Sequence, residues 1–262
     1  MNSYVLGALA LIIVIGGGYW IYMTRPAAPQ VQEQMPTNMS QTISQNVSYF
    51  QGANGYFVRP TAAGNYPGVV MIHENRGLRP EIKQAADNLA KEGYMVLAVD
   101  LFQGQVLETQ EEARAFTAQF DQAQGIANLR AAAQYLRGQG ASKVASWGWC
   151  FGGRQSVNLA ISGEPMDATV VYYGGGMATT TEQLAPIRWP VMGVFGDQDQ
   201  AIPVSMVRTF ESSLNTLGIE NEIYIYPGVG HAFANPSSPN HAPEETADAW
   251  AKTVAFLDKH LK

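Results

Sequence analysis

The apolar residues of this chain recur in short runs that are separated by stretches with a helical period. The runs at residues 68–73 and 95–99 lack polar alternation, which is typical of strands buried on both faces of a sheet. Between them, Pro80 opens a stretch whose apolar residues fall on one face, and Gly93 follows its end. The pattern predicts a helix over residues 81–92 between two buried strands.

The same alternation continues to the end of the chain. It predicts further strands over residues 144–147, 168–173, 191–195 and 222–226, and further helices over residues 109–120, 126–136, 203–217 and 243–261, with one more ending near residue 161. Such alternation indicates an α/β fold, with a mostly parallel sheet covered by helices on both faces. Residues 47–50 and 56–58 predict an antiparallel hairpin ahead of this sheet. One domain over residues 46–262 is therefore expected.

The first residues carry a different pattern. Residues 4–23 contain no charged side chain, and about 20 apolar residues suffice to span a bilayer. Tyr and Trp residues stand at the ends of this segment, as they do at membrane interfaces. We therefore expect a transmembrane anchor over residues 1–24. A linker rich in Pro, Gln and Ser is expected over residues 25–45.

The orientation of this anchor rests on a general tendency. An N-terminal signal anchor in a bacterium usually exports the domain behind it, which favours a single-pass anchor with a periplasmic domain. The amino terminus and Arg25 place similar positive charge on the two sides, so the charge rule does not decide the orientation. Cleavage after the segment is the alternative, because Ala27 and Ala28 offer small residues to a signal peptidase.

Composition narrows the range of functions. The formal net charge is -6 and there is no basic cluster, which argues against nucleic-acid binding. The single cysteine excludes an internal disulfide, and the four histidines show no zinc-ligand spacing. The sequence contains neither a Walker loop nor a glycine-rich dinucleotide motif. We expect no metal and no organic cofactor, and the composition leaves the oligomeric state open.

The cysteine stands at the centre of the most informative motif. Cys150 lies in Gly148-Trp149-Cys150-Phe151-Gly152-Gly153, directly after a predicted strand. Glycines around a central nucleophile are typical of a nucleophile elbow, a sharp turn that presents the side chain above the sheet. The positive end of the following helix would stabilise a thiolate there. A small buried core cysteine is the alternative.

Two downstream loops carry the partners that such a nucleophile needs. The loop at residues 196–203 follows a predicted strand and contains Asp197 and Asp199, and His231 lies on a later glycine-rich loop. Elbow hydrolases place nucleophile, acid and histidine in this chain order. Open α/β sheets place their sites at the carboxyl ends of the strands. Order and placement together indicate a nucleophile–histidine–acid triad.

These motifs resemble those of the dienelactone hydrolase family of α/β-hydrolases. The similarity extends from about residue 47 to the end of the chain and includes the segment at residues 70–78, Val-Met-Ile-His-Glu-Asn-Arg-Gly-Leu. It implies Asp199 as the acid of the triad, with Asp197 as the second choice. It also implies that Glu74 is the carboxylate that pairs with the resting thiol.

The resemblance also implies a reaction. Cys150 would attack a small ester or lactone, His231 would take the proton of the thiol, and water would hydrolyse the thioester. The oxyanion hole of this superfamily consists of two backbone N–H groups, which we assign to Phe151 and Asn75.

The substrate-binding residues of the family transfer poorly to this sequence. Its two carboxylate-binding arginines are replaced by Gly104 and Asn235, so an anionic lactone loses its charged anchors. Arg76 could compensate, although an exposed arginine at the start of a helix is the simpler interpretation. A thioesterase, a carboxylesterase or a peptidase on the same scaffold is an alternative function. A tethered binding protein without activity is another.

Several other residues have structural interpretations. His73 has two interpretations, a structural hydrogen bond or contact with the pocket, and His241 and His260 are expected to be solvated. One or two of the aromatic residues near the catalytic loops should shape an acyl pocket, with core packing explaining the others: Trp149, Phe151, Phe102 and Phe233.

Overall fold

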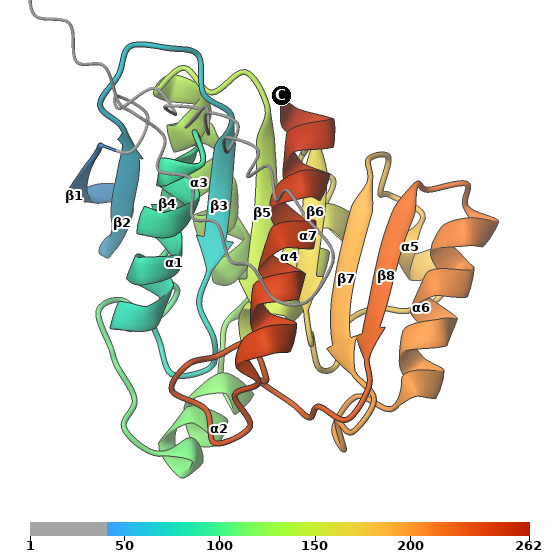
Figure 1. The fold of residues 1–262 in the computed structure, drawn as a ribbon. Helices are drawn as coiled ribbons and strands as arrows, with labels where there is room; N and C mark the ends of the chain where they lie inside the picture. The colour runs from blue at the N-terminus through green and yellow to red at the C-terminus, as the bar shows by residue number, and fades with distance from the viewer. Residues whose placement is uncertain (1–40) are drawn as a thin grey trace, which may run out of the picture. The chain divides into compact units, whose positions relative to one another are not determined.

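A computed structural model describes residues 41–262, which build one eight-stranded sheet (Figure 1). The strands are β1 (Thr42–Phe50), β2 (Ala53–Pro60), β3 (Gly68–Ile72), β4 (Met95–Ala98), β5 (Val144–Trp149), β6 (Ala168–Tyr172), β7 (Val191–Gly196) and β8 (Asn221–Tyr226). Their order is β1-β2-β4-β3-β5-β6-β7-β8. The β1–β2 and β2–β4 pairs are antiparallel, and every other neighbouring pair is parallel. The mostly parallel sheet and its lead-in hairpin are as predicted.

Helices cover both faces of this sheet. They are α1 (Pro80–Lys91), α2 (Gln110–Ala118), α3 (Gln122–Gly138), α4 (Phe151–Ile161), α5 (Thr181–Leu184), α6 (Val204–Thr216) and α7 (Pro243–Leu261). In Figure 1, α1 and α7 lie in front of the sheet, and α3 and α4 lie behind it. The central strands β3 to β7 are buried throughout, which explains why their sequences are uninterrupted apolar runs.

Local sequence signals fix the helix ends. Pro80 is the first residue of α1, where its missing N–H costs no hydrogen bond. Thr109 and Glu112 form a capping box at the start of α2. The carboxylate of Asp121 accepts two backbone N–H groups at the start of α3. This cap starts α3 at Gln122, four residues ahead of the predicted helix.

The boundaries at the N-terminal side differ from the expectation. β1 begins at Thr42, so residues 42–45 belong to the hairpin rather than to the expected linker. Their polar sequence lacks the signal of a strand because β1 is an edge strand that pairs on one side only. The expected anchor lies outside the described residues. Within residues 41–262, no helix is both long and apolar enough to cross a bilayer.

Candidate active site

The elbow has the predicted geometry. Cys150 lies between the buried strand β5 and the first residue of α4, and its backbone adopts φ 53° and ψ -113°. Residues other than glycine rarely adopt these backbone angles, and holding one there costs about 1–3 kcal/mol. The surrounding fold must therefore support the turn. This sharp turn directs the half-buried Cys150 side chain away from the carboxyl end of β5.

Glycines allow the backbone to pack this closely. A Cβ atom on Gly148 would lie 2.1 Å from the carbonyl oxygen of Gly152. A Cβ atom on Gly152 would lie 2.3 Å from the carbonyl oxygen of Ile72, on β3. Both distances are far below any van der Waals contact, and the obstacles are backbone atoms that cannot rotate away. The elbow glycines are therefore required by the packing of α4 against β3 and β5.

Cys150, His231 and Asp199 form a continuous hydrogen-bonded chain. The Nε2 atom of His231 lies 3.1 Å from the Sγ atom of Cys150. Its Nδ1 atom lies 2.7 Å from Oδ2 of Asp199. The three residues come from the ends of β5, β7 and β8, at the lower edge of the sheet in Figure 1. The structure thus brings together the three residues of the predicted triad.

The loop after β7 distinguishes the two candidate acids. Asp199 is buried, and its Oδ1 atom accepts the backbone N–H groups of Ala201 and Ile202 at 2.8 and 3.1 Å. Asp197 instead accepts the backbone N–H of Gly228 at 2.7 Å. Asp199 therefore faces the imidazole, whereas Asp197 ties together the loops that follow β7 and β8.

The surroundings of His231 favour the charged form of its imidazole. Burial by itself lowers the pKa of His231. The hydrogen bonds to Asp199 and Cys150, together with the negative charges of these groups, outweigh burial and raise the pKa to about 10. A proton on the imidazole, between the sulfur and the acid, is consequently stabilised.

Glu74 lies in the site but not against the thiol. Its Oε1 atom accepts the hydroxyl of Tyr173 at 3.4 Å, and its Oε2 atom accepts the side-chain amide of Asn235. Burial raises the pKa of Glu74, although the hydrogen bond from Asn235 and the nearby His231 oppose the shift. The expected pairing of Glu74 with Cys150 is therefore not the arrangement in this structure. His231 contacts the thiol, and Asn235 and Tyr173 bind the carboxylate.

A small cavity of about 170 Å³ opens beside the sulfur and the imidazole. Asn75 and Arg76 line it, but Gly104 does not. The backbone N–H of Gly104 is bound to Asp100. Arg76 is neither free nor simply exposed, because its guanidinium donates to the backbone carbonyls of Leu107 and Glu108. The cavity therefore presents few unengaged cationic groups.

The two residues predicted to donate their backbone N–H groups to an oxyanion, Phe151 and Asn75, lie on different elements. Phe151 is the first residue of α4, so its backbone N–H has no acceptor within the helix. Asn75 lies on the loop after β3 and lines the cavity. Both positions lie next to residues of the site, Cys150 and Glu74, along the chain.

Sequence reasoning missed two residues that organise the site. Tyr173 follows β6 with a positive φ of 35°, and its ring meets that of His231 edge-on with centroids 5.3 Å apart. Asn240 donates its side-chain amide to the backbone carbonyl of His231 at 2.9 Å. The available signal for Tyr173 was its place at the carboxyl end of a central strand. Asn240 lies in a loop whose sequence does not indicate a contact with the site.

The other singled-out residues have mixed outcomes. His73 is buried and structural, which agrees with the first of its two interpretations: its Nε2 atom accepts the backbone N–H of Leu101, and its Nδ1 atom therefore donates to the carbonyl of Glu74. Phe233 is a core residue. His241, expected to be solvated, and Trp149 line an apolar pocket next to the site. Within the described part of the chain, no group of His, Cys, Asp and Glu side chains could hold a metal ion.

The fold and the geometry of the elbow define an α/β-hydrolase. Residues 53–261 match the dienelactone hydrolase family, and the chain belongs to this family. It is therefore a hydrolase that acts on carboxylic ester bonds.

Relatives agree with this assignment. A Synechocystis protein assigned by name to the carboxymethylenebutenolidases is 30% identical over 79% of this chain and 92% of its own length. A dienelactone hydrolase-like promiscuous phosphotriesterase from metagenomic libraries has a similar fold, with a TM-score of 0.76, 24% identity, and coverage of 84% and 99% of the two chains. The dienelactone hydrolase of Anabaena variabilis gives a TM-score of 0.63, 20% identity, and coverage of 85% and 99%.

Proposed function

We propose that this protein hydrolyses a small ester or lactone through Cys150, His231 and Asp199, with a thioester acyl-enzyme as intermediate. The observation that carries the proposal is the hydrogen-bonded chain from the sulfur through the imidazole to the buried carboxylate, at 3.1 and 2.7 Å. A strained elbow that presents the sulfur to a cavity supports it further.

The proposed reaction has two halves. The sulfur of Cys150 attacks the ester carbonyl, and the charge on the oxygen is stabilised by the backbone N–H groups of Phe151 and Asn75. Collapse of this intermediate expels the alcohol, which takes the proton held by His231 and leaves a thioester. His231 then removes a proton from water, which attacks the thioester and releases the acid. Asp199 holds the imidazole in the required tautomer throughout.

The substrate differs in charge from the anionic lactones that the family resemblance implies. Asn235 stands in place of one arginine and donates to Glu74, while Gly104, in place of the other, lies outside the cavity. Arg76 is held by the chain at residues 107 and 108. A neutral ester or lactone therefore suits this cavity better than an anionic one.

The test compares wild type with Cys150→Ala and Cys150→Ser on a short, soluble ester. Loss of at least about three orders of magnitude in kcat for both variants is expected, since the nucleophile acts with its partners as a unit. Circular dichroism should show an unchanged fold. Activity that survives in Cys150→Ala would overturn the proposal, and absence of hydrolysis by the wild type across short esters and lactones would favour a binding protein.

We further propose that residues 4–23 anchor the enzyme to a membrane, with the catalytic domain on the periplasmic side. The support is the sequence itself: a charge-free apolar segment of spanning length followed by a polar linker. The full chain should then sediment with membranes and require detergent for release. Protease added outside spheroplasts should digest the catalytic domain. Full protection of the domain would contradict the orientation, and a freely released shorter chain would indicate cleavage near Ala27.

A further inference from the structure

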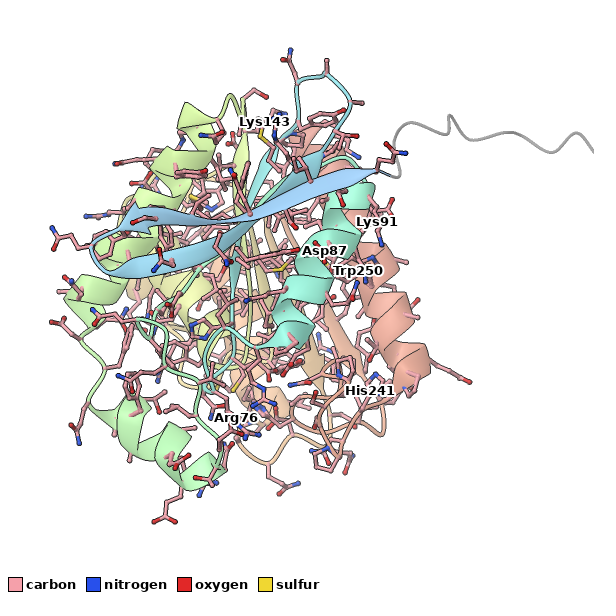
Figure 2. All side chains as sticks on the ribbon, turned by 90° about the vertical axis from the view of Figure 1, so that its left-hand side faces the viewer. Arg76, Asp87, Lys91, Lys143, His241 and Trp250 are labelled. Atoms are coloured by element: carbon pink, nitrogen blue, oxygen red, sulfur yellow. The ribbon has the colours of Figure 1, made fainter. Side chains whose placement is uncertain are left out.

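A second cavity lies directly beside the proposed catalytic cavity, between α1 and α7. Its volume is about 430 Å³, compared with about 170 Å³ around Cys150. Figure 2 shows the two helices side by side, with Trp250 on α7 and His241 just before it. We refer to this cavity as the α1–α7 pocket.

The wall of the α1–α7 pocket is largely apolar and aromatic. Six of its lining residues are Ile82, Ala85, Trp149, Tyr172, Ala247 and Trp250. The hydroxyl of Tyr172 is hydrogen-bonded to Thr253 at 2.8 Å, so the aromatic ring is the part left for a ligand. Trp149 and Trp250 both pack on Trp147, with ring centroids 4.7 and 5.0 Å away. This wall is therefore fixed by core packing rather than by loops.

The two cavities share part of their lining. Residues that line both are Glu74, Glu81, Ile82 and Asn235. Asn235 donates to Glu74 across this shared wall, and it lies on the same loop as His231. The two cavities are therefore neighbours, and a substituent of a carbonyl held at Cys150 lies beside the wall that they share. By contrast, a larger cavity of about 570 Å³ beside α2 shares no residue with the catalytic cavity.

The charges at the shared wall exclude anions. Glu74 and Glu81 supply carboxylates, and Asn235 is neutral. Arg79, which lines the catalytic cavity, is paired with Glu81 at 3.0 Å. A negatively charged substituent would meet these carboxylates and an apolar interior that no arginine or lysine lines, which is costly. An uncharged apolar group gains from the same surroundings.

We infer that the α1–α7 pocket is the specificity site of this hydrolase and that it receives an uncharged alkyl or aryl substituent of the ester. The inference rests on the proposed function of Cys150 and adds the substrate class. Each methylene that moves from water into the pocket should raise kcat/KM about fourfold, because burial of one methylene is worth about 0.8 kcal/mol and a factor of ten corresponds to about 1.4 kcal/mol.

The experiment measures kcat/KM of the full chain on two series of soluble esters, ethyl alkanoates and alkyl acetates, by proton release. One series lengthens the acid and the other lengthens the alcohol. The inference expects a rise of about fourfold per methylene in at least one series, up to the length of the pocket. If kcat/KM did not change with chain length in either series, the inference would be overturned. Ethyl octanoate should also exceed the monoethyl ester of octanedioic acid at least tenfold, and the reverse preference would contradict the apolar assignment.

A substitution that fills the α1–α7 pocket can be compared with a matched substitution outside it. Ala247 and Ala251 are both exposed residues of α7, but only Ala247 lines the pocket. Ala247→Phe should lower the ratio of kcat/KM for long against short esters at least tenfold, whereas Ala251→Phe should leave it as in wild type. An unchanged ratio in Ala247→Phe would overturn the inference. Ala247→Leu, with a smaller and intermediate effect, covers the case in which the phenylalanine variant does not fold.

The outcome separates the inference from the proposed function. Loss of short-ester hydrolysis in Cys150→Ala, combined with flat series in wild type, would retain the nucleophile and reject the pocket. Length dependence that persists while Cys150→Ala remains active would reject the nucleophile instead.

Discussion

Asp199 and Glu74 are two carboxylates of the same site, and their surroundings give them different properties. Asp199 is buried, accepts two backbone N–H groups through one oxygen, and accepts His231 through the other. Glu74 accepts only the neutral side chains of Asn235 and Tyr173, and burial raises its pKa. One carboxylate thus has two backbone donors and the imidazole around it, whereas the other is desolvated with only neutral partners.

The difference predicts two separate roles for the carboxylates of this site. A carboxylate with fixed donors can orient an imidazole and stabilise its charge. A carboxylate with a raised pKa costs free energy when ionised and responds more readily to its neighbours. Asp199 should therefore be needed for the chemistry, while Glu74 should tune the site and its connection with the α1–α7 pocket.

The largest effect is expected from Asp199→Asn. The variant keeps the shape of the side chain but removes the charge and the acceptor that selects the tautomer of His231. We expect kcat/KM for short esters to fall about 10³- to 10⁴-fold, the scale known for removal of such a charge from a triad. Asp197→Asn is the control on the same loop and should stay within a few fold. Equal losses in both variants would contradict the assignment of Asp199.

The next effect is a pH dependence of stability. The pKa of His231 is raised from 6.5 to about 10 in the folded protein. The stability that this provides is therefore fully present below about pH 6.5 and is lost as the pH rises through 10. Urea unfolding of wild type and His231→Gln should give a difference in unfolding free energy of up to a few kcal/mol at pH 6, shrinking toward pH 10. A difference that grows with pH would contradict the ion pair.

The smallest effect is expected from Glu74→Gln. Its amide cannot accept from Asn235 and Tyr173 as two carboxylate oxygens do, and we expect about a tenfold loss of kcat/KM, the value of one hydrogen bond to a charged group. Since the desolvation cost of the carboxylate disappears, the melting temperature should remain equal to wild type or rise. Asp199→Asn should lower it. A Glu74→Gln variant as inactive as Asp199→Asn would remove the distinction between the two carboxylates.

The sequence predicted the parts of the site that depend on local pattern and chain order. The apolar runs placed the strands, the glycines around Cys150 indicated the elbow, and the strand-end loops indicated Asp199 and His231. These features follow from backbone sterics and from the period of the sheet. The family resemblance was needed to prefer Asp199 over Asp197, because both lie on one acidic loop.

Contacts between distant segments could not be predicted in the same way. The hydrogen bond from Asn235 to Glu74 joins residues that lie 161 positions apart. Nothing in the sequence around either residue indicates this contact. The α1–α7 pocket likewise arises where α1, β5, β6 and α7 meet. A wall residue such as Trp250 looks like an ordinary core position in the sequence of its own helix. Only the packed fold shows that these residues leave a space.

The central claim is that Cys150 carries the acyl group during turnover. The most direct measurement mixes the full chain with a short ester, quenches within milliseconds in acid, and maps the adduct by mass spectrometry of the peptides. The account predicts an acyl group on the peptide that contains Cys150, formed in wild type and absent from Cys150→Ala. Turnover without any such adduct, together with an active Cys150→Ala variant, would contradict it.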